Sequence, residues 1–192
     1  MVAVSLVVLG YLSGSVPYGA LLAKWIKGVD VRHAGSGNIG ATNVARVAGR
    51  KLGVLVLILD AAKGAVPVSL SLWLTEKPEI HAAVGLAAFL GHVFPVWLRF
   101  RGGKGVATAF GVIAILQPWA ALAGFAAYGV LFAIFRVSSI GSLAGGTAAV
   151  VVAFLKAGPR AYAVLVLVLF VLMLVTHRGN IRRLLSRAEK PL

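Results

Sequence analysis

The chain has 192 residues, of which 60% are hydrophobic and only 12% are charged. Soluble domains carry about 25% charged and about 45–50% apolar residues. A water-soluble protein of this size cannot bury so much apolar surface, so the soluble, disordered and collagen-like classes are excluded. The chain has no cysteine, which excludes a disulfide scaffold, a thiolate nucleophile and a cysteine-ligated metal. The net charge of +14 would suit a nucleic-acid binder, but in a membrane protein it more often reports orientation, so no nucleic-acid partner is expected.

Long uncharged runs predict an all-α, polytopic membrane protein that forms a single domain over residues 1–192. A spanning helix needs about 20 mostly apolar residues, and about 17 can suffice. The run over residues 105–135 is too long for one span, and Gln117–Pro118 divides it in two because proline suits the first turn of a new helix. We therefore expect seven transmembrane helices. They lie within Met1–Ala23, Gly53–Leu74, Ile80–Leu98, Gly105–Phe135 (two spans), Val137–Leu155 and Ala161–Thr176.

The lysines and arginines are distributed unequally over the connections between these spans. With seven spans, fifteen of the 19 fall on one side of the membrane, and three (Lys77, Lys156 and Arg160) fall on the other. Lys63 lies within a span. The positive-inside rule places the rich side in the cytoplasm. The N-terminus is then expected outside and the C-terminus in the cytoplasm.

Four polar, glycine-rich segments lie near the predicted cytoplasmic side. They are Ser13–Gly19, Gly35–Arg46, Gly91–Gly105 and Thr176–Asn180, and none contains Asp or Glu. Glycines let backbone N–H groups approach a ligand closely, and such groups together with Arg and Lys make an anion site. The segments therefore predict a strongly anionic ligand, and a phosphate fits this chemistry best. The alternative interpretation is that these are positive-inside loops that touch lipid headgroups.

No metal or organic cofactor is expected. The four histidines form no His-x-x-x-His pair, and few of the five acids lie near the polar segments. The pattern Gly35-x-Gly37-x-x-Gly40 matches a dinucleotide fingerprint, but no strand precedes it and no βαβ unit follows, which excludes a Rossmann site.

Two charged residues fall inside a predicted span. Asp60 and Lys63 are spaced i, i+3, and because isolated charges are costly there, we expect them to pair with each other or to face a wet cavity. His92 lies near the end of an apolar helix and is interpreted as a packing or hydrogen-bonding residue rather than a ligand.

These residues, in this order, resemble the bacterial acyl-phosphate:glycerol-3-phosphate acyltransferase family of integral membrane enzymes. The resemblance covers nearly the whole chain. It is carried by Ser13–Gly19, by Gly35–Arg46 as a phosphate-binding loop, by Gly91–Gly105, by Asp60-x-x-Lys63-Gly64 and by His177–Asn180. It implies transfer of a fatty acyl group from acyl phosphate to the 1-hydroxyl of sn-glycerol 3-phosphate, giving lysophosphatidic acid and phosphate.

The resemblance also implies a location and partners. The enzyme would be a multi-pass protein of the bacterial cytoplasmic (inner) membrane with its active site at the cytoplasmic face. Acyl phosphate, glycerol 3-phosphate and membrane lipid would be its partners, and a soluble enzyme that makes acyl phosphate is a candidate fourth.

Residue roles follow as a hypothesis from the resemblance and the residue chemistry. Lys104, Arg46 and His177 are the expected catalytic residues, with the two cations neutralising phosphate charge. The proton of the attacking hydroxyl would pass to a substrate phosphate oxygen or to His177. The expected substrate-binding residues are Ser36, Gly37, Asn38, Gly40, Ala41, Thr42, Asn43, Ser142 and Asn180.

Other classes of function remain as alternatives at this stage. A transporter of phosphorylated anions would place its site near the midplane, often between repeated halves, whereas here the polar segments gather at one face and no internal repeat is evident. A non-catalytic scaffold that binds headgroups is the third reading. The His-x4-Asp class of acyltransferases is excluded, since no histidine is followed five residues later by an aspartate.

Overall fold

The computed structural model describes residues 1–189 and 191, so Lys190, one of the fifteen basic residues counted above, lies outside it. Every regular element in the described part of the chain is helical, which agrees with the predicted fold class. The chain divides into two compact units, Met1–Val112 and Ile113–Leu192, and each is described by itself. The expectation of a single domain stays a prediction.

The elements are α1 (Val2–Ser15), α2 (Tyr18–Lys27), α3 (Ala41–Ala48), α4 (Arg50–Leu74), α5 (Pro78–Val93), the 3-10 helix η1 (Val96–Leu98), α6 (Val106–Leu116), α7 (Pro118–Phe135), α8 (Ser138–Leu155), α9 (Arg160–Thr176) and α10 (Arg178–Leu185).

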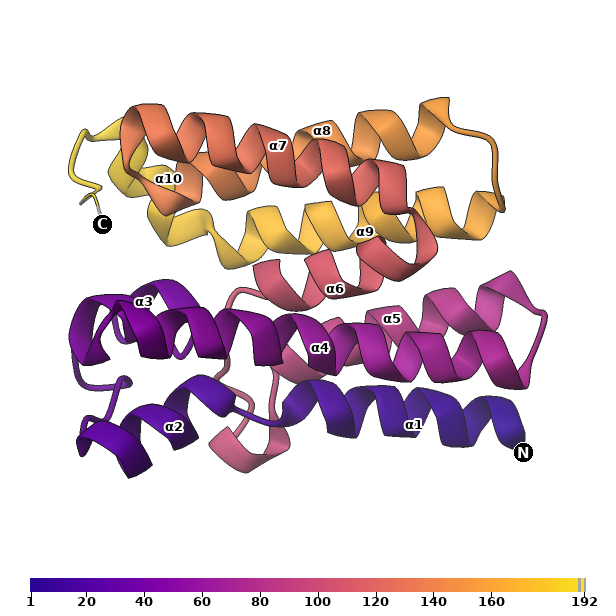
Figure 1. Ribbon diagram of the computed structural model, residues 1–192, viewed down its shortest axis with the longest axis horizontal. Coiled ribbons are helices and arrows are strands. Elements are labelled where there is room, and N and C mark those ends of the chain that lie inside the picture. The colour runs from indigo at the N-terminus through magenta and orange to yellow at the C-terminus, as the bar shows by residue number, and fades with distance from the viewer. Residues whose placement is uncertain (190, 192) are drawn as a thin grey trace. The chain divides into compact units, whose positions relative to one another are not determined.

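In the first unit, α1, α4 and α5 pack against one another (Figure 1). The approach of α1 to α5 is close because small residues line it. A Cβ atom on Gly14 would lie 1.9 Å from the carbonyl oxygen of Ala88, so no larger residue fits there without a shift of the helices. Small residues are the usual means of close helix packing in membranes, where water supplies no hydrophobic driving force between helices.

The first predicted span, Met1–Ala23, is not one continuous helix. It breaks at Val16–Pro17, because proline cannot continue the helical ladder, and resumes as α2, which extends to Lys27. The break leaves the carbonyl of Val16 outside that ladder. The ammonium of Lys63 in α4 donates to this oxygen at 2.8 Å, and the hydroxyl of Ser13 donates to the carbonyl of Lys63 at 2.9 Å. A backbone group freed within a span is thus paired by a neighbouring helix.

The loop between α2 and α3 folds back on a small apolar core of its own. Ala23, Val31, Ile39, Val44 and Val56 are buried in it, drawn from α2, the loop, α3 and α4. This core holds the loop against the helices.

In the second unit, α7 pairs with α8 and α8 with α9 (Figure 1). The predicted division at Gln117–Pro118 is confirmed: α6 ends at Leu116 and α7 begins at Pro118. After α9 the chain bends by 61° at His177 and continues as the short helix α10, which the sequence analysis did not predict.

Five helical stretches among the described residues are long and apolar enough to cross a membrane. They are Val2–Lys27, Arg50–Leu74, Pro78–Leu98, Pro118–Phe135 and Ser138–Leu155, and the bent pair α9 with α10 makes a sixth if it counts as one span. Helix α6 has 11 residues and rises about 16 Å, short of the roughly 30 Å hydrocarbon core. An apolar helix occupies each of the seven predicted places, but the number of spans that length and composition support is five or six.

The outward surfaces of these helices are apolar. Large hydrophobic side chains such as Ile58, Phe125 and Phe154 are more than half exposed. Such a surface suits lipid rather than water. Trp73 and Trp119 are also exposed, close to helix ends, as expected for residues at a membrane interface. Together with the composition, these surfaces make this an integral membrane protein.

Candidate functional site

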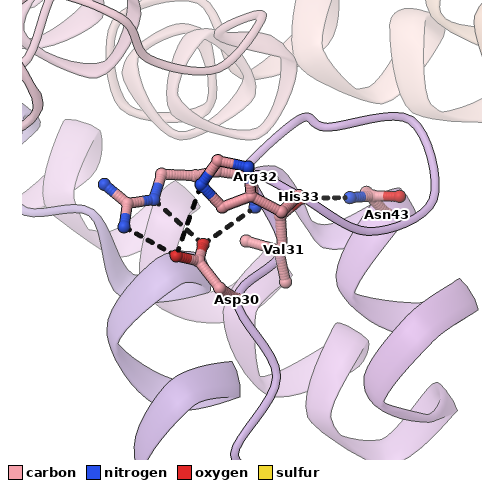
Figure 2. Close-up of polar contacts among 5 residues, drawn as sticks. All are labelled: Asp30, Val31, Arg32, His33 and Asn43. Atoms are coloured by element: carbon pink, nitrogen blue, oxygen red, sulfur yellow. Dashed lines mark hydrogen bonds and ion pairs between the residues drawn. The ribbon is translucent and has the colours of Figure 1, made fainter.

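The glycine-rich segment of the first unit is organised by one buried side chain, Asn43. Its amide nitrogen donates to the carbonyls of Val31, Ala34 and Asn38 at 3.1, 3.0 and 2.9 Å. Its oxygen accepts the N–H of Ser36 at 2.8 Å. Figure 2 shows the Asn43 side chain directed toward the segment that contains Val31. The sequence predicts that Asn43 binds substrate, and in the structure its side chain ties together the two ends of the loop.

A glycine is required where this side chain meets the loop. Gly35 has φ +61°, and a Cβ atom there would lie 2.3 Å from the Asn43 side-chain oxygen. Both the backbone conformation and the space therefore favour glycine.

Several backbone N–H groups of the loop donate hydrogen bonds within the loop itself. These groups are therefore not available to a ligand. The N–H of Gly37 donates to the carbonyl of Ala34, and the N–H of Gly40 donates to the Asn38 side chain at 2.8 Å. The Ser36 N–H is held by Asn43, and Ala41 and Thr42 lie in the first turn of α3, at the positive end of that helix.

Thr42 and Arg46 lie one turn apart on α3 and therefore share a helical face. Thr42 is half-buried and makes contacts of its own, whereas the side chain of Arg46 is exposed. Ser36 and Gly37 are exposed at the outer edge of the loop.

The start of the loop is pinned by an acid that the sequence analysis did not single out. Asp30 accepts from the Arg32 guanidinium at 2.9 and 2.7 Å and from the Arg32 backbone N–H at 3.0 Å (Figure 2). The hydrogen bonds from Arg32 hold the pKa of Asp30 well below its usual range. His33 lies 4.0 Å from the same carboxylate. Asp30 therefore fixes the turn and neutralises one cation of the loop.

Lys104 is carried by an irregular segment between η1 and α6. Arg99 and Phe100 both have positive φ values, which turn the chain back toward α5. The N–H groups of Gly102 and Gly103 then donate to the carbonyls of Val93 and His92 at 3.0 and 3.1 Å. Lys104 is half-buried between Gly103 and Gly105, both of which are buried.

Asp60 and Lys63 form the predicted ion pair. The Lys63 ammonium lies 2.7 Å from Asp60 Oδ1, and both side chains are at most 3% exposed. His92 is buried beside them, with Nδ1 3.7 Å from the same oxygen, as the packing interpretation of this histidine expected.

In the second unit, His177 lies at the junction of α9 and α10 and is 2% exposed. Its Nδ1 lies 2.9 Å from the carbonyl of Met173. A carbonyl oxygen only accepts, so Nδ1 must carry the proton, and in the neutral ring Nε2 carries the lone pair. Ser142 on α8 is buried and donates to the carbonyl of Ser138 at 2.9 Å, which leaves its hydroxyl oxygen able to accept.

A carboxylate from the C-terminal segment also lies in the second unit, and sequence reasoning missed it. Glu189 accepts from the Ser139 hydroxyl at 3.1 Å, from the Arg183 guanidinium at 2.5 Å and from the Asn180 amide. Burial acts to raise the pKa of Glu189, but these hydrogen bonds outweigh it, and the pKa lies below its ordinary value. Asn180, expected to bind substrate, is thus one of three donors that converge on an anion.

The structure therefore places the predicted residues in two groups. The loop residues, Arg46 and Lys104 belong to the first unit, and Ser142, His177 and Asn180 belong to the second. Among the described residues, no three His, Asp or Glu side chains lie close enough together to hold a metal ion.

Comparison with known proteins assigns these residues to a family. The family model described as glycerol-3-phosphate acyltransferase matches residues 4–187. A glycerol-3-phosphate acyltransferase of Myxococcus xanthus (strain DK1622) is 60% identical over 97% of both chains, and one of Anaeromyxobacter sp. (strain Fw109-5) is 53% identical over 96% of this chain and 94% of the relative.

Two solved structures are also similar. They are crystal structures of PlsY (YgiH), an integral membrane glycerol 3-phosphate acyltransferase, in a glycerol 3-phosphate form and a lysophosphatidic acid form. Their TM-scores are 0.95 and 0.93, and each is 39% identical over all of this chain and 96% of its own. From its sequence and its fold alike, this chain belongs to the glycerol-3-phosphate acyltransferase family.

Proposed function

We propose that this protein transfers a fatty acyl group from acyl phosphate to the 1-hydroxyl of sn-glycerol 3-phosphate, and releases lysophosphatidic acid and phosphate. The observation that carries the proposal is the match of the whole chain to glycerol-3-phosphate acyltransferases, one of them a structure in a glycerol 3-phosphate form. The residue chemistry supports it independently, because the polar segments offer cations, hydroxyls and backbone N–H groups and contain no carboxylate.

The choice of donor follows from what the reaction needs. The hydroxyl oxygen attacks the acyl carbonyl carbon, the bond from that carbon to the phosphate oxygen breaks, and phosphate departs with the electron pair. A mixed anhydride is already activated, so no strong carboxylate base is required. Transition-state stabilisation can then come mainly from positioning and from preorganised charge.

In the first unit, the start of α3 and the loop before it serve the phosphoryl group of the donor. The backbone N–H groups of Ala41 and Thr42 lie at the positive end of the helix, and Asn43 holds the loop that leads into this turn. Arg46 and Lys104 supply positive charge for phosphate oxygens. Lys104 is the stronger contributor, because a half-buried ammonium is less screened by water than the exposed guanidinium of Arg46.

In the second unit, His177, Asn180 and Ser142 serve glycerol 3-phosphate. Ser139, Asn180 and Arg183 converge on the Glu189 carboxylate, and this concentration of donors supports a phosphate or a hydroxyl as the ligand of the second unit. Two acceptors suit the proton of the attacking hydroxyl, namely an oxygen of the leaving phosphate and Nε2 of His177. A His177→Gln variant distinguishes them, since loss of a base lowers kcat by roughly 100-fold or more, whereas loss of an orienting hydrogen bond mainly raises KM.

For the membrane arrangement we propose seven spans, an external N-terminus and a cytoplasmic C-terminus, in the cytoplasmic membrane of a bacterium. Fifteen basic residues against three support this orientation. The donor would reach the loop from the bilayer or from a soluble enzyme that makes it. A reporter fused after Leu192 should be active only in the cytoplasm, and activity only outside would contradict the orientation.

Donor competition tests the proposed reaction. Purified protein in lipid vesicles receives glycerol 3-phosphate with either palmitoyl phosphate or palmitoyl-CoA. Lysophosphatidic acid should form from the acyl phosphate and not from the thioester. Equal rates with the two donors would contradict the proposal.

A further inference from the structure

The buried Asp60, Lys63 and His92 take part in no step of the proposed reaction, yet they lie directly behind the segment that carries Lys104. We propose that His92, oriented by the Asp60–Lys63 pair, is a positioning residue that fixes the Gly102–Gly105 segment and thereby the ammonium of Lys104. The inference rests on the proposed function, because it gives a purpose to the position of Lys104.

His92 touches this segment through both its backbone and its ring. Its carbonyl accepts the N–H of Gly103 at 3.1 Å. A Cβ atom on Gly103 would lie 2.1 Å from Nε2 of the His92 ring, so the ring packs directly against the Gly103 backbone. The residue next to Lys104 is therefore in contact with His92 on two sides.

The other neighbour of Lys104 is held by the same helix. Gly105 has φ +84°, and a Cβ atom there would lie 2.1 Å from the ring of Phe89. Phe89 and His92 are three residues apart on α5 and so lie on one face of it. Lys104 thus lies between two glycines that pack against His92 and Phe89. A change in either of these side chains moves the backbone of Lys104.

The ion pair explains why a histidine, rather than an apolar residue, fills this place. Nδ1 of His92 has no hydrogen-bond partner among the described residues, and Asp60 Oδ1 lies 3.7 Å from it. Asp60 is itself fixed by Lys63, which is anchored to the Val16 carbonyl at 2.8 Å. The attraction between Asp60 and His92 sets the rotation of the ring. A buried ion pair often contributes little to stability compared with apolar side chains, so a role in orientation accounts for its presence here.

A double-mutant cycle between His92 and Lys104 tests the inference. His92→Leu keeps the volume and loses the contact with Asp60, and it should lower kcat/KM by about 100-fold in the wild-type background, the loss that a misplacement of about 1 Å can cause. In the Lys104→Ala background the same substitution should change the rate by no more than about twofold, the scatter expected of the method. The matched control is His81→Leu, since His81 is also buried in α5 but contacts the carbonyl of Thr75.

The outcomes separate the inference from the proposed function. Equal losses from His92→Leu in the two backgrounds would assign His92 a structural role and overturn the inference. Full activity of Lys104→Ala would overturn the proposed role of Lys104 and the inference with it. His92→Asn can place an N–H near the position that Nδ1 occupies in the wild type, and it should recover part of the activity lost in His92→Leu.

A second variant covers the case in which His92→Leu does not fold. Asp60→Asn combined with Lys63→Met removes both buried charges and leaves no unpaired ion. The Val16 carbonyl also loses its Lys63 donor, so the melting temperature should fall, and kcat measured at a temperature where the variant is folded should fall as well. A kcat that stays at the wild-type value in the folded variant would show that the ion pair orients nothing.

Discussion

Asn43 offers the sharpest test of the loop structure, because its replacement by aspartate exchanges a hydrogen-bond donor for an acceptor while the shape of the side chain stays nearly constant. In Asn43→Asp the amide nitrogen that donates to three carbonyls becomes an oxygen that faces them. The contact with the Ser36 N–H survives. In Asn43→Ala all four contacts are lost without added repulsion. Leaving a buried polar group unpaired costs about 1–3 kcal/mol, and two or more carbonyls are affected here. We expect Asn43→Ala to lose about 2–4 kcal/mol of stability, and Asn43→Asp to lose more.

The measurement is thermal unfolding of the purified variants in detergent, together with protease cleavage within residues 30–40. Asn38→Asp is the matched control, since the Asn38 side chain accepts from the Gly40 N–H and an aspartate can do the same. The control should unfold near the wild-type temperature with its loop protected. If Asn43→Asp is as stable as wild type, or more stable than Asn43→Ala, the donor network assigned to Asn43 is wrong.

Four further outcomes are expected. Lys104→Ala should lower kcat/KM by roughly 30–1,000-fold, and Lys104→Arg should also be poor because a planar fork does not replace a compact ammonium between glycines. Arg50→Ala is the control, and retention of more than half the activity by Lys104→Ala would reject a catalytic role. The carboxylate of Glu189, whose pKa is lowered by its donors, should stabilise the fold at neutral pH and lose that contribution as the pH falls through the lowered pKa. The difference in melting temperature between wild type and Glu189→Gln should therefore vanish in acid, and a constant difference would count against the contact. Gly14→Ala should destabilise the protein by about 1–3 kcal/mol, because its methyl group would meet the backbone of α5, whereas Gly129→Ala, with open space around it, should be neutral or stabilising in the same unfolding assay. A chelator such as EDTA should leave the rate unchanged, and loss that a divalent ion restores would overturn the metal-free mechanism.

Composition and the lengths of uncharged runs were enough to predict an all-helical membrane protein and to divide residues 105–135 at Gln117–Pro118. The break at Val16–Pro17 was harder to predict. A proline inside an apolar run is tolerated when a neighbouring helix pairs the freed carbonyl, and the partner here, Lys63, is 47 residues away. Helix α6 has the apolar composition of a span but not its length.

For the site, residue type identified the right segments but not what each side chain does. The sequence predicts Asn43 as a substrate-binding residue, and in the structure its amide nitrogen and oxygen both hydrogen-bond within the loop. Glu189 lies outside the polar segments in the sequence, and only the folded chain brings it to Asn180 and Arg183. The i, i+3 spacing predicted the Asp60–Lys63 pair because both partners lie on one helix, whereas the place of His92 beside them depends on how α5 packs on α4.

The most direct test of the proposed reaction measures how much lysophosphatidic acid forms for each phosphate released. The purified protein in phospholipid vesicles receives palmitoyl phosphate and glycerol 3-phosphate labelled with ¹⁸O at the 1-hydroxyl. Attack at the acyl carbon predicts one lysophosphatidic acid for each phosphate released, with the label retained in the ester of the product. The Lys104→Ala protein, prepared in parallel, should show both products suppressed together. Release of phosphate without lysophosphatidic acid, or label in the released phosphate, would contradict acyl transfer to the 1-hydroxyl.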